Sequence, residues 1–162
     1  MPRRLIRSLT AIAALMVLSL PAAAACSKPQ GFKSLQADLV AQLNAERRKR
    51  GLATFVYSPT LGSAAQTHAC DNARRHSISH EGSDGGRLQN RLRRVGYDYR
   101  AASENTGRGF STGSRAVEWW MHSPGHKKNI LMHQTREVGV GIAMSAAPDS
   151  RMHWILVMGA EK

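Results

Sequence analysis

Residues 119–130, WWMHSPGHKKNI, mark a boundary between two helices and place a histidine just after it. The residue before a proline is disfavoured in the α region, so the helix that carries Trp120 is expected to end by Ser123. Ser123 can cap a second helix with Pro124 at its first position, which puts His126 in the first turn. A helix N-terminus lowers the pKa of a histidine and favours its neutral form, which is the form that binds metals. His126 is therefore a candidate site residue, with a buried structural histidine as the alternative.

The pattern upstream of this stretch is helical, and downstream it changes to strands. Helices are predicted over residues 35–50, from Ser58–Pro59 onward, through residues 88–92 and across residues 116–121. Residues 100–110 are polar and contain glycine, so any strand there is expected to be short. The segments EVGVGIAMS and RMHWILVMG predict two strands. Helices first and strands last, without a βαβ repeat, predict one α+β domain with helices packed on a small antiparallel sheet.

The first 25 residues have the features of a secretory signal peptide. Three arginines precede a short apolar run, and Ala23–Ala25 provides the small residues that a signal peptidase needs. The run is too short and too interrupted for a membrane span of about 20 apolar residues. We therefore predict a signal peptide over residues 1–25, a mature domain over residues 26–162, and a secreted or periplasmic location.

The mature chain contains two cysteines, Cys26 and Cys70. In an oxidising compartment the pair most simply forms one disulfide. Lipidation of Cys26 is the alternative, because the preceding alanines loosely resemble a lipoprotein signal, although such signals usually carry leucine at the position of Ala23. The sequence favours the disulfide and leaves the lipid anchor open.

The chain is strongly basic, with a formal net charge of +12. The excess is concentrated in the runs 47–50 and 91–94. A basic face would raise the rate of encounter with anionic envelope surfaces, although a merely well-solvated surface has the same composition. No aromatic residues interleave with the arginines, as a nucleic-acid stacking platform would require, so nucleic acid is not an expected partner.

Three motifs in order, S-H-x-G, E-N and W-M-x-S-P-G-H-x-x-N-I-L, resemble the CAP superfamily of cysteine-rich secretory proteins, antigen five and pathogenesis-related proteins. Together with LNAERRKRGL, EVGVGIA and HWILVMG, they extend the resemblance from about residue 35 to residue 159. The likeness is to the short bacterial secreted branch. It implies an α-β-α sandwich with a central cleft, which in some members binds a divalent ion such as zinc.

Carried over by motif, the cleft residues are His80, Glu104 and His126. The resemblance implies that His80 and His126 are ligands of zinc or another divalent cation. The family's second glutamate is replaced here by Ser123, and Glu118 lies one helical turn earlier. Two histidines and one glutamate still form a chemically adequate zinc set with one open position.

The resemblance favours a non-enzymatic extracytoplasmic binding module, acting as a monomer on a lipid, glycan or protein ligand. A metal-dependent hydrolase is the alternative, with an ion on His80 and His126 activating water and Glu104 as general base or third ligand. A protein that associates with envelope surfaces through its basic face is the third interpretation. Serine-hydrolase chemistry is not expected, because Ser123 lacks a G-x-S-x-G setting.

The remaining candidates have structural interpretations. His68 lies on the small-residue face of the second helix and is expected to be a core histidine. Asn44 and Arg47 match a family signature and are expected to brace helix packing. The three tryptophans are expected in the core, although one of them could line the cleft.

Overall fold

The computed structural model describes residues 26–145 and 152–162, so the predicted signal peptide lies outside the described residues. The elements follow the order α1 (Phe32–Arg48), β1 (Val56–Tyr57), α2 (Pro59–Arg74), α3 (Leu88–Arg94), β2 (Tyr99–Arg108), α4 (Gly113–His122), α5 (Pro124–Ile130), β3 (Glu137–Met144) and β4 (Met152–Glu161). The predicted α+β class is confirmed, as is the order of helices before the two long C-terminal strands.

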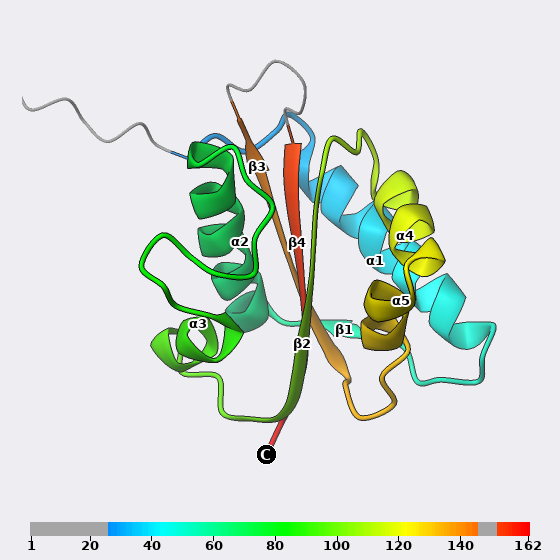
Figure 1. Cartoon of the computed structure of the whole chain (residues 1–162). Coiled ribbons are helices and arrows are strands. Elements are labelled where there is room, and N and C mark those ends of the chain that lie inside the picture. Colours follow the sequence, from blue (N-terminus) through cyan, green and yellow to red (C-terminus); the bar gives the residue numbers. More distant parts are fainter. Residues whose placement is uncertain (1–25, 146–151) are drawn as a thin grey trace, which may run out of the picture.

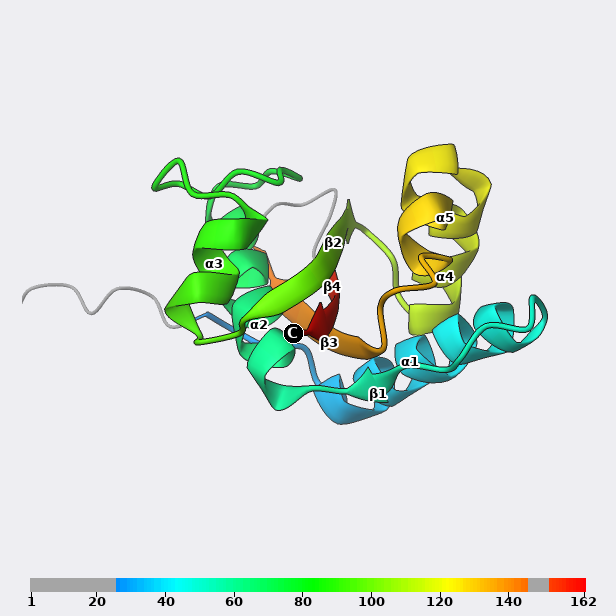
Figure 2. The same ribbon diagram turned by 90° about the horizontal axis from the view of Figure 1, so that it is seen from below.

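The strands form one sheet in the order β1-β3-β4-β2. β4 pairs antiparallel with β3 on one side and with β2 on the other, and the short β1 pairs parallel with β3. Helices α2 and α3 cover one face, while α1, α4 and α5 cover the other (Figures 1 and 2). The architecture is therefore a three-layer α-β-α sandwich.

The central strand β4 supplies both halves of the core. Trp154, Leu156 and Met158 belong to the cluster shared with α1 and α4. Ile155 and Val157 alternate with them and belong to the cluster shared with α2 and α3. Successive side chains of a strand point to opposite faces, so a strand covered on both sides needs a continuous apolar run rather than an alternating one.

Two glycines of β3 let α2 lie directly on the sheet. A Cβ atom on Gly139 would be 2.1 Å from the carbonyl carbon of Leu61, and one on Gly141 would be 2.3 Å from that of Ala65. Both neighbours are backbone atoms, so no side-chain rotation can make room. The GVG motif and the small residues of α2 are therefore complementary parts of one close contact.

The expectation of at most a short strand at residues 100–110 is wrong, because β2 is ten residues long and pairs with β4 along its length apart from an irregularity at Arg100. The β2 sequence is polar because the strand lies at the edge of the sheet. There, side chains from other elements donate hydrogen bonds to its backbone carbonyls. The indole of Trp120 donates to the Thr106 carbonyl at 2.9 Å, and the Asn129 amide donates to the Glu104 carbonyl at 3.1 Å. These partners are distant in sequence, so local pattern does not reveal the strand.

Arg47 ties α1 to the chain segment that leads into β3. Its side chain is fully buried and lies over the Phe55 ring at 4.0 Å. The guanidinium donates to four backbone carbonyls, those of Ala53, Ile130, Met132 and Thr135, at 2.6–3.1 Å. Asn44 bonds both the amide and the carbonyl of Phe55. The prediction that Asn44 and Arg47 brace the packing of the first helix is confirmed.

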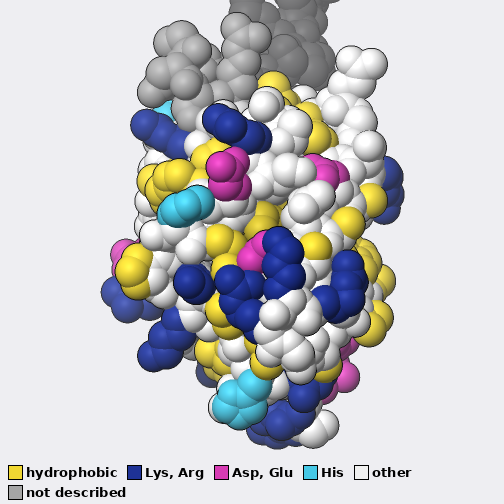
Figure 3. Space-filling model, turned by 90° about the vertical axis from the view of Figure 1, so that its right-hand side faces the viewer, with side chains coloured by type: hydrophobic (Ala, Val, Ile, Leu, Met, Phe, Trp, Pro, Cys, Tyr) yellow, Lys and Arg dark blue, Asp and Glu magenta, His cyan; other side chains and the backbone are white. Residues whose placement is uncertain are grey.

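Two arginines of the predicted basic runs do not reach the surface. Arg47 and Arg91 are buried, so neither contributes to the surface. Lys49 and Arg50 both pair with Glu46. Figure 3 shows the face formed by α1, α4 and α5, where cationic side chains are mixed with acidic and hydrophobic ones. Among the described helices, none is long and apolar enough to cross a bilayer.

Cys26 and Cys70 form a disulfide, as predicted. The bond fastens the segment before α1 to the C-terminal part of α2 across 44 positions of sequence. It also occupies the Cys26 sulfur, which is the atom that the alternative lipid anchor would need.

Replacing both cysteines by serine is expected to lower the free energy of unfolding by up to about 4 kcal/mol, because a closed loop of this length restricts the unfolded chain. Chemical denaturation of the oxidised wild type and the double variant measures the difference. Thiols that alkylate without reductant, or an intact mass carrying acyl chains, would contradict the disulfide.

Candidate functional site

Glu104 is the centre of the candidate site, and the structure gives both of its carboxylate oxygens a partner. Its side chain projects from β2 and is buried. Oε1 lies 2.8 Å from Nδ1 of His80, and Oε2 accepts from Nη2 of Arg91 at 2.7 Å. Arg91 is itself buried, so this ion pair is shielded from solvent. Glu104 and His80, two of the three residues that the family resemblance names, are thus in contact, and Arg91 is an additional member of the cluster.

The loop between α2 and α3 presents His80, and buried groups hold the backbone of this loop. Arg91 donates to the carbonyls of His80 at 3.2 Å and Gly86 at 3.1 Å. Asn72 donates to the carbonyl of Ser79 at 3.0 Å. The His80 side chain remains 59% exposed. Because Nδ1 is used by Glu104, Nε2 is the ring nitrogen left for a ligand.

His126 comes from the opposite side of β2, on α5 (Figure 1). Its ring is partly buried, and Nδ1 is buried without a hydrogen-bond partner among the described residues. The pKa of His126 is lowered, first by burial and then by the nearby His80. The predicted direction of the shift is right, but the cause is burial rather than the helix N-terminus. Ser123 occupies the N-cap position, although its side chain makes no capping bond.

Two asparagines fasten α5 to the edge of β2 and so fix the distance between His126 and Glu104. Asn105 donates to the His126 carbonyl at 3.1 Å. Asn129 donates to the Asn105 side chain at 2.9 Å and to the Glu104 carbonyl at 3.1 Å. Sequence reasoning assigned neither asparagine a role, although both stand in the motifs E-N and H-x-x-N that identify the two segments.

His68, on α2, lies next to the Glu104 carboxylate in the interior. It is buried, as expected of a core histidine, and its Nε2 lies 2.7 Å from the Ser79 carbonyl. The same nitrogen is 3.9 Å from Oε1 of Glu104. Burial lowers the pKa of His68, which outweighs the opposing effect of the Glu104 charge. The lowered pKa favours the neutral form of His68, which belongs to both the core and the site.

The donor set fits a divalent cation only in part. Within residues 26–145 and 152–162, no three His, Cys, Asp or Glu side chains are grouped as a metal site. Glu118 does not replace the missing glutamate, because its side chain pairs with Arg115 on the exposed side of α4. However, a metal-binding histidine typically bonds a carboxylate through its other nitrogen, as His80 bonds Glu104. The ring of His126, whose Nδ1 is buried without a hydrogen-bond partner among the described residues, is the second candidate ligand.

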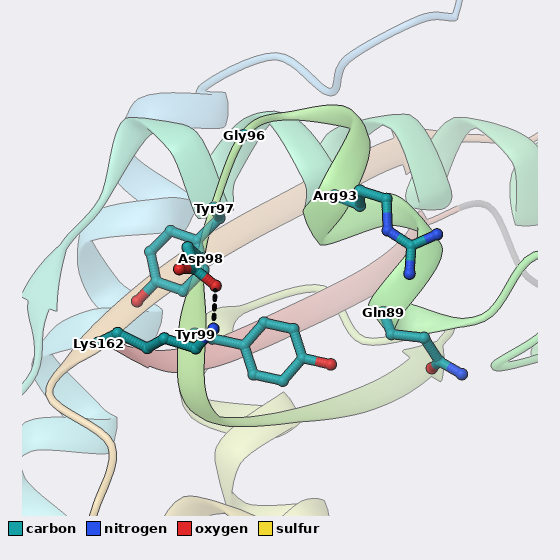
Figure 4. A pocket seen from close by; sticks show the side chains of 7 residues that line it. All are labelled: Gln89, Arg93, Gly96, Tyr97, Asp98, Tyr99 and Lys162. Atoms are coloured by element: carbon teal, nitrogen blue, oxygen red, sulfur yellow. Dashed lines mark ion pairs between the residues drawn. The ribbon is translucent and has the colours of Figure 1, made fainter.

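A separate hollow of about 460 Å³ lies away from these residues, between α3 and the start of β2. Figure 4 shows its lining, with Gln89 and Arg93 on α3 and an ion pair of 2.9 Å between Asp98 and Lys162. Its lining is mostly exposed and mixes charged side chains with two tyrosines. The hollow shares no residue with the Glu104 cluster, so size alone does not locate the site.

Sequence comparison identifies relatives of the chain. The family model of the cysteine-rich secretory protein family, CAP, matches residues 40–158. The uncharacterized protein YkwD of Bacillus subtilis is 31% identical over 121 residues, which make up 75% of this chain and 47% of that protein. The uncharacterized membrane protein YlbC of the same organism is 32% identical over 99 residues, or 61% of this chain and 29% of that protein. The chain thus spans about half or less of the length of these curated relatives.

Solved structures show the same architecture. An outer surface protein from Borrelia burgdorferi has a TM-score of 0.74 at 19% identity, covering 85% of this chain and 99% of that one. An extracellular protein containing an SCP domain from Bacillus anthracis has a TM-score of 0.68 at 23% identity, covering 84% and 45%. NaASP2, solved with Zn²⁺, has a TM-score of 0.57 at 12% identity, covering 84% and 85%. At these identities the likeness concerns the fold, and it confirms the predicted sandwich.

Proposed function

Because the chain belongs to the cysteine-rich secretory protein family, CAP, we propose that it is an extracytoplasmic binding module whose ligand site, called the cleft below, is formed by His80, Glu104 and His126. The family and its neighbours are typically extracellular, and the N-terminal sequence has signal-peptide features. The observation that carries the proposal is the buried, unpartnered Nδ1 of His126 beside the His80–Glu104 pair. A buried polar atom without a partner is costly, and a ligand atom would supply one.

Binding suits this cleft better than hydrolysis does. Both oxygens of Glu104 are engaged, one by His80 and one by the buried Arg91. A general base needs to reach a water or substrate proton at hydrogen-bonding distance, and Glu104 instead orients His80. We assign Glu104 and Arg91 the role of positioning residues, and His80 and His126 the role of contacting the ligand.

A divalent cation is the simplest ligand that two imidazoles can recognise. Zinc would be held by His80 and His126, and water would have to fill its remaining coordination positions. Zinc sites usually have three or four protein ligands, so this one would have fewer than usual. We therefore expect weak binding compared with a structural zinc site. When bound, the cation would supply a positive charge for an anionic group of a larger ligand.

Zinc titration of the purified chain tests the proposal. We expect His126→Ala and His80→Ala each to weaken zinc binding at least about tenfold, while His133→Ala, which removes an exposed histidine outside the cleft, leaves it unchanged. Binding should weaken as the pH falls, since protonated imidazole cannot coordinate; the lowered pKa of His126 keeps that residue competent to a lower pH than a free histidine. Unchanged zinc affinity in His126→Ala, with lower stability, would make His126 a packing residue.

A further inference from the structure

We propose that the ring of Trp119 is a stacking surface for one saccharide ring, next to the histidine cleft. The two consecutive tryptophans of α4 have opposite environments: Trp120 is fully buried, whereas Trp119 is 47% exposed. The prediction of a core position holds for Trp120 and Trp154, whereas Trp119 is the exposed one of the three. A large aromatic ring left in water forgoes the free energy of burial, which a ligand covering it would recover.

Two aromatic neighbours hold the indole in place. Its centroid lies 5.6 Å from the Phe110 ring at an interplanar angle of 47°, and 5.2 Å from the His126 ring at 41°. Both are ordinary tilted aromatic contacts. The Trp119 ring is thus held in place next to the His126 ring. Because it is already ordered, a ligand that binds to it loses little free energy in ordering the side chain.

The surroundings of the indole match the chemistry of a sugar. Phe110, Trp119, Arg115, Glu118 and His122 line a hollow of about 250 Å³. A pyranose presents a face of C–H groups, which packs on an aromatic ring, and a rim of hydroxyls, each of which needs donors and acceptors. Arg115 provides donors, Glu118 provides acceptors, and their loose ion pair of 3.8 Å leaves both side chains largely exposed. Sites of about 300–1,000 Å³ hold drug-sized ligands, so this hollow suits a single ring.

The acidic group argues against insertion of the same patch into a membrane. Burying Trp119 in a lipid interface would bring Glu118 toward a medium in which a carboxylate is strongly disfavoured. The mixture of acidic, basic and hydrophobic side chains on this face is visible in Figure 3. Such a mixture suits the hydroxyls of a saccharide, whereas segments that bind at a membrane interface are rich in Lys and Arg beside Trp, Phe and Leu.

The inference deepens the proposed function and rests on it, because the ring contact with His126 makes Trp119 one wall of the same ligand site. The cleft histidines would contact polar groups of the ligand, and Trp119 would define it as a carbohydrate. Variants of Trp119 therefore test whether the ligand is a carbohydrate. Variants of His80 and His126 test whether the cleft binds a ligand.

Tryptophan fluorescence gives a direct test, since Trp120 and Trp154 are buried and Trp119 alone of the three is exposed. We expect glucose, N-acetylglucosamine or their short β-linked oligomers to protect the wild type from acrylamide quenching. Trp119→Ala should weaken sugar binding, followed by NMR titration, at least about tenfold, and Trp119→Phe should retain part of it. Glu118→Gln should weaken it without changing the unfolding transition. His133→Ala is the matched surface control and should bind as the wild type does.

The outcomes separate this inference from the proposed function. Sugar binding that is lost in Trp119→Ala but unchanged in His126→Ala supports the stacking surface and contradicts the cleft. Zinc binding that depends on His126, with no sugar bound or with equal binding in Trp119→Ala, supports the cleft and overturns the stacking surface. A shift of Trp119 emission on anionic vesicles, in the absence of any sugar effect, would also overturn the inference and assign the patch to a membrane.

Discussion

Replacing Gly141 by valine is expected to leave the chain unable to adopt its fold. A Cβ atom at this position would lie 2.3 Å from the carbonyl carbon and oxygen of Ala65, so α2 would have to move away from β3 along its length. A single backbone atom of α2 cannot move aside by itself, because the hydrogen bonds of the helix hold it in place. Alanine should already cost more than about 3 kcal/mol of unfolding free energy, at the upper end for overpacking.

Gly125→Ala is the matched control, because it adds the same methyl group where no heavy atom lies within 4 Å. Gly125 stands in the first turn of α5, so alanine there should stabilise the chain by about 0.5–1 kcal/mol through lower unfolded-state entropy. Chemical denaturation followed by circular dichroism measures both variants. A Gly141→Ala chain within about 1 kcal/mol of the wild type would show that α2 does not pack on β3 as closely as described.

Replacing Arg47 by methionine is expected to lower the free energy of unfolding by about 3–5 kcal/mol. Methionine keeps much of the aliphatic volume but removes every donor to the four carbonyls that the guanidinium joins. Each buried acceptor left without a partner costs about 1–3 kcal/mol, and the segment before β3 can relax to recover part of it. The stacking of the guanidinium on Phe55 is lost as well.

Arg48→Met separates this effect from the loss of charge, since Arg48 is the next residue of α1 and is exposed. Its replacement should change the unfolding free energy by no more than about 0.5 kcal/mol. Thermal and chemical denaturation of the two variants, side by side, is the measurement. Equal effects at the two positions would mean that Arg47 contributes mainly through charge, and the role assigned to its hydrogen bonds would be wrong.

The sequence predicts most of the helices on both faces of the sheet. Ser58 and Pro59 begin α2, with the Ser58 side chain accepting from the amide of Leu61. Pro124 begins α5 directly after Ser123. These boundaries depend on residues next to one another in the chain, where steric and capping rules apply locally. The two apolar C-terminal segments are likewise strands β3 and β4.

The candidate site is predicted less completely, because its remaining members act through partners far away in sequence. Arg91 appears in a run of surface charge, yet it pairs with Glu104 across 13 positions in the interior. Arg47 stands in another such run and is also buried. A charged residue has the same local appearance whether it is solvated or paired, so only the tertiary fold separates the two states.

The central place of β4 sets the order in which the fold can form. Both long neighbours, β2 and β3, take their hydrogen bonds from residues 152–161, which leave the ribosome after the other described elements. Before that moment α1 can meet α4 and α2 can meet β3, but both core clusters still lack Trp154 to Met158, which contribute to each of them. Folding then requires contacts between distant segments, which makes it slow for a chain of this size.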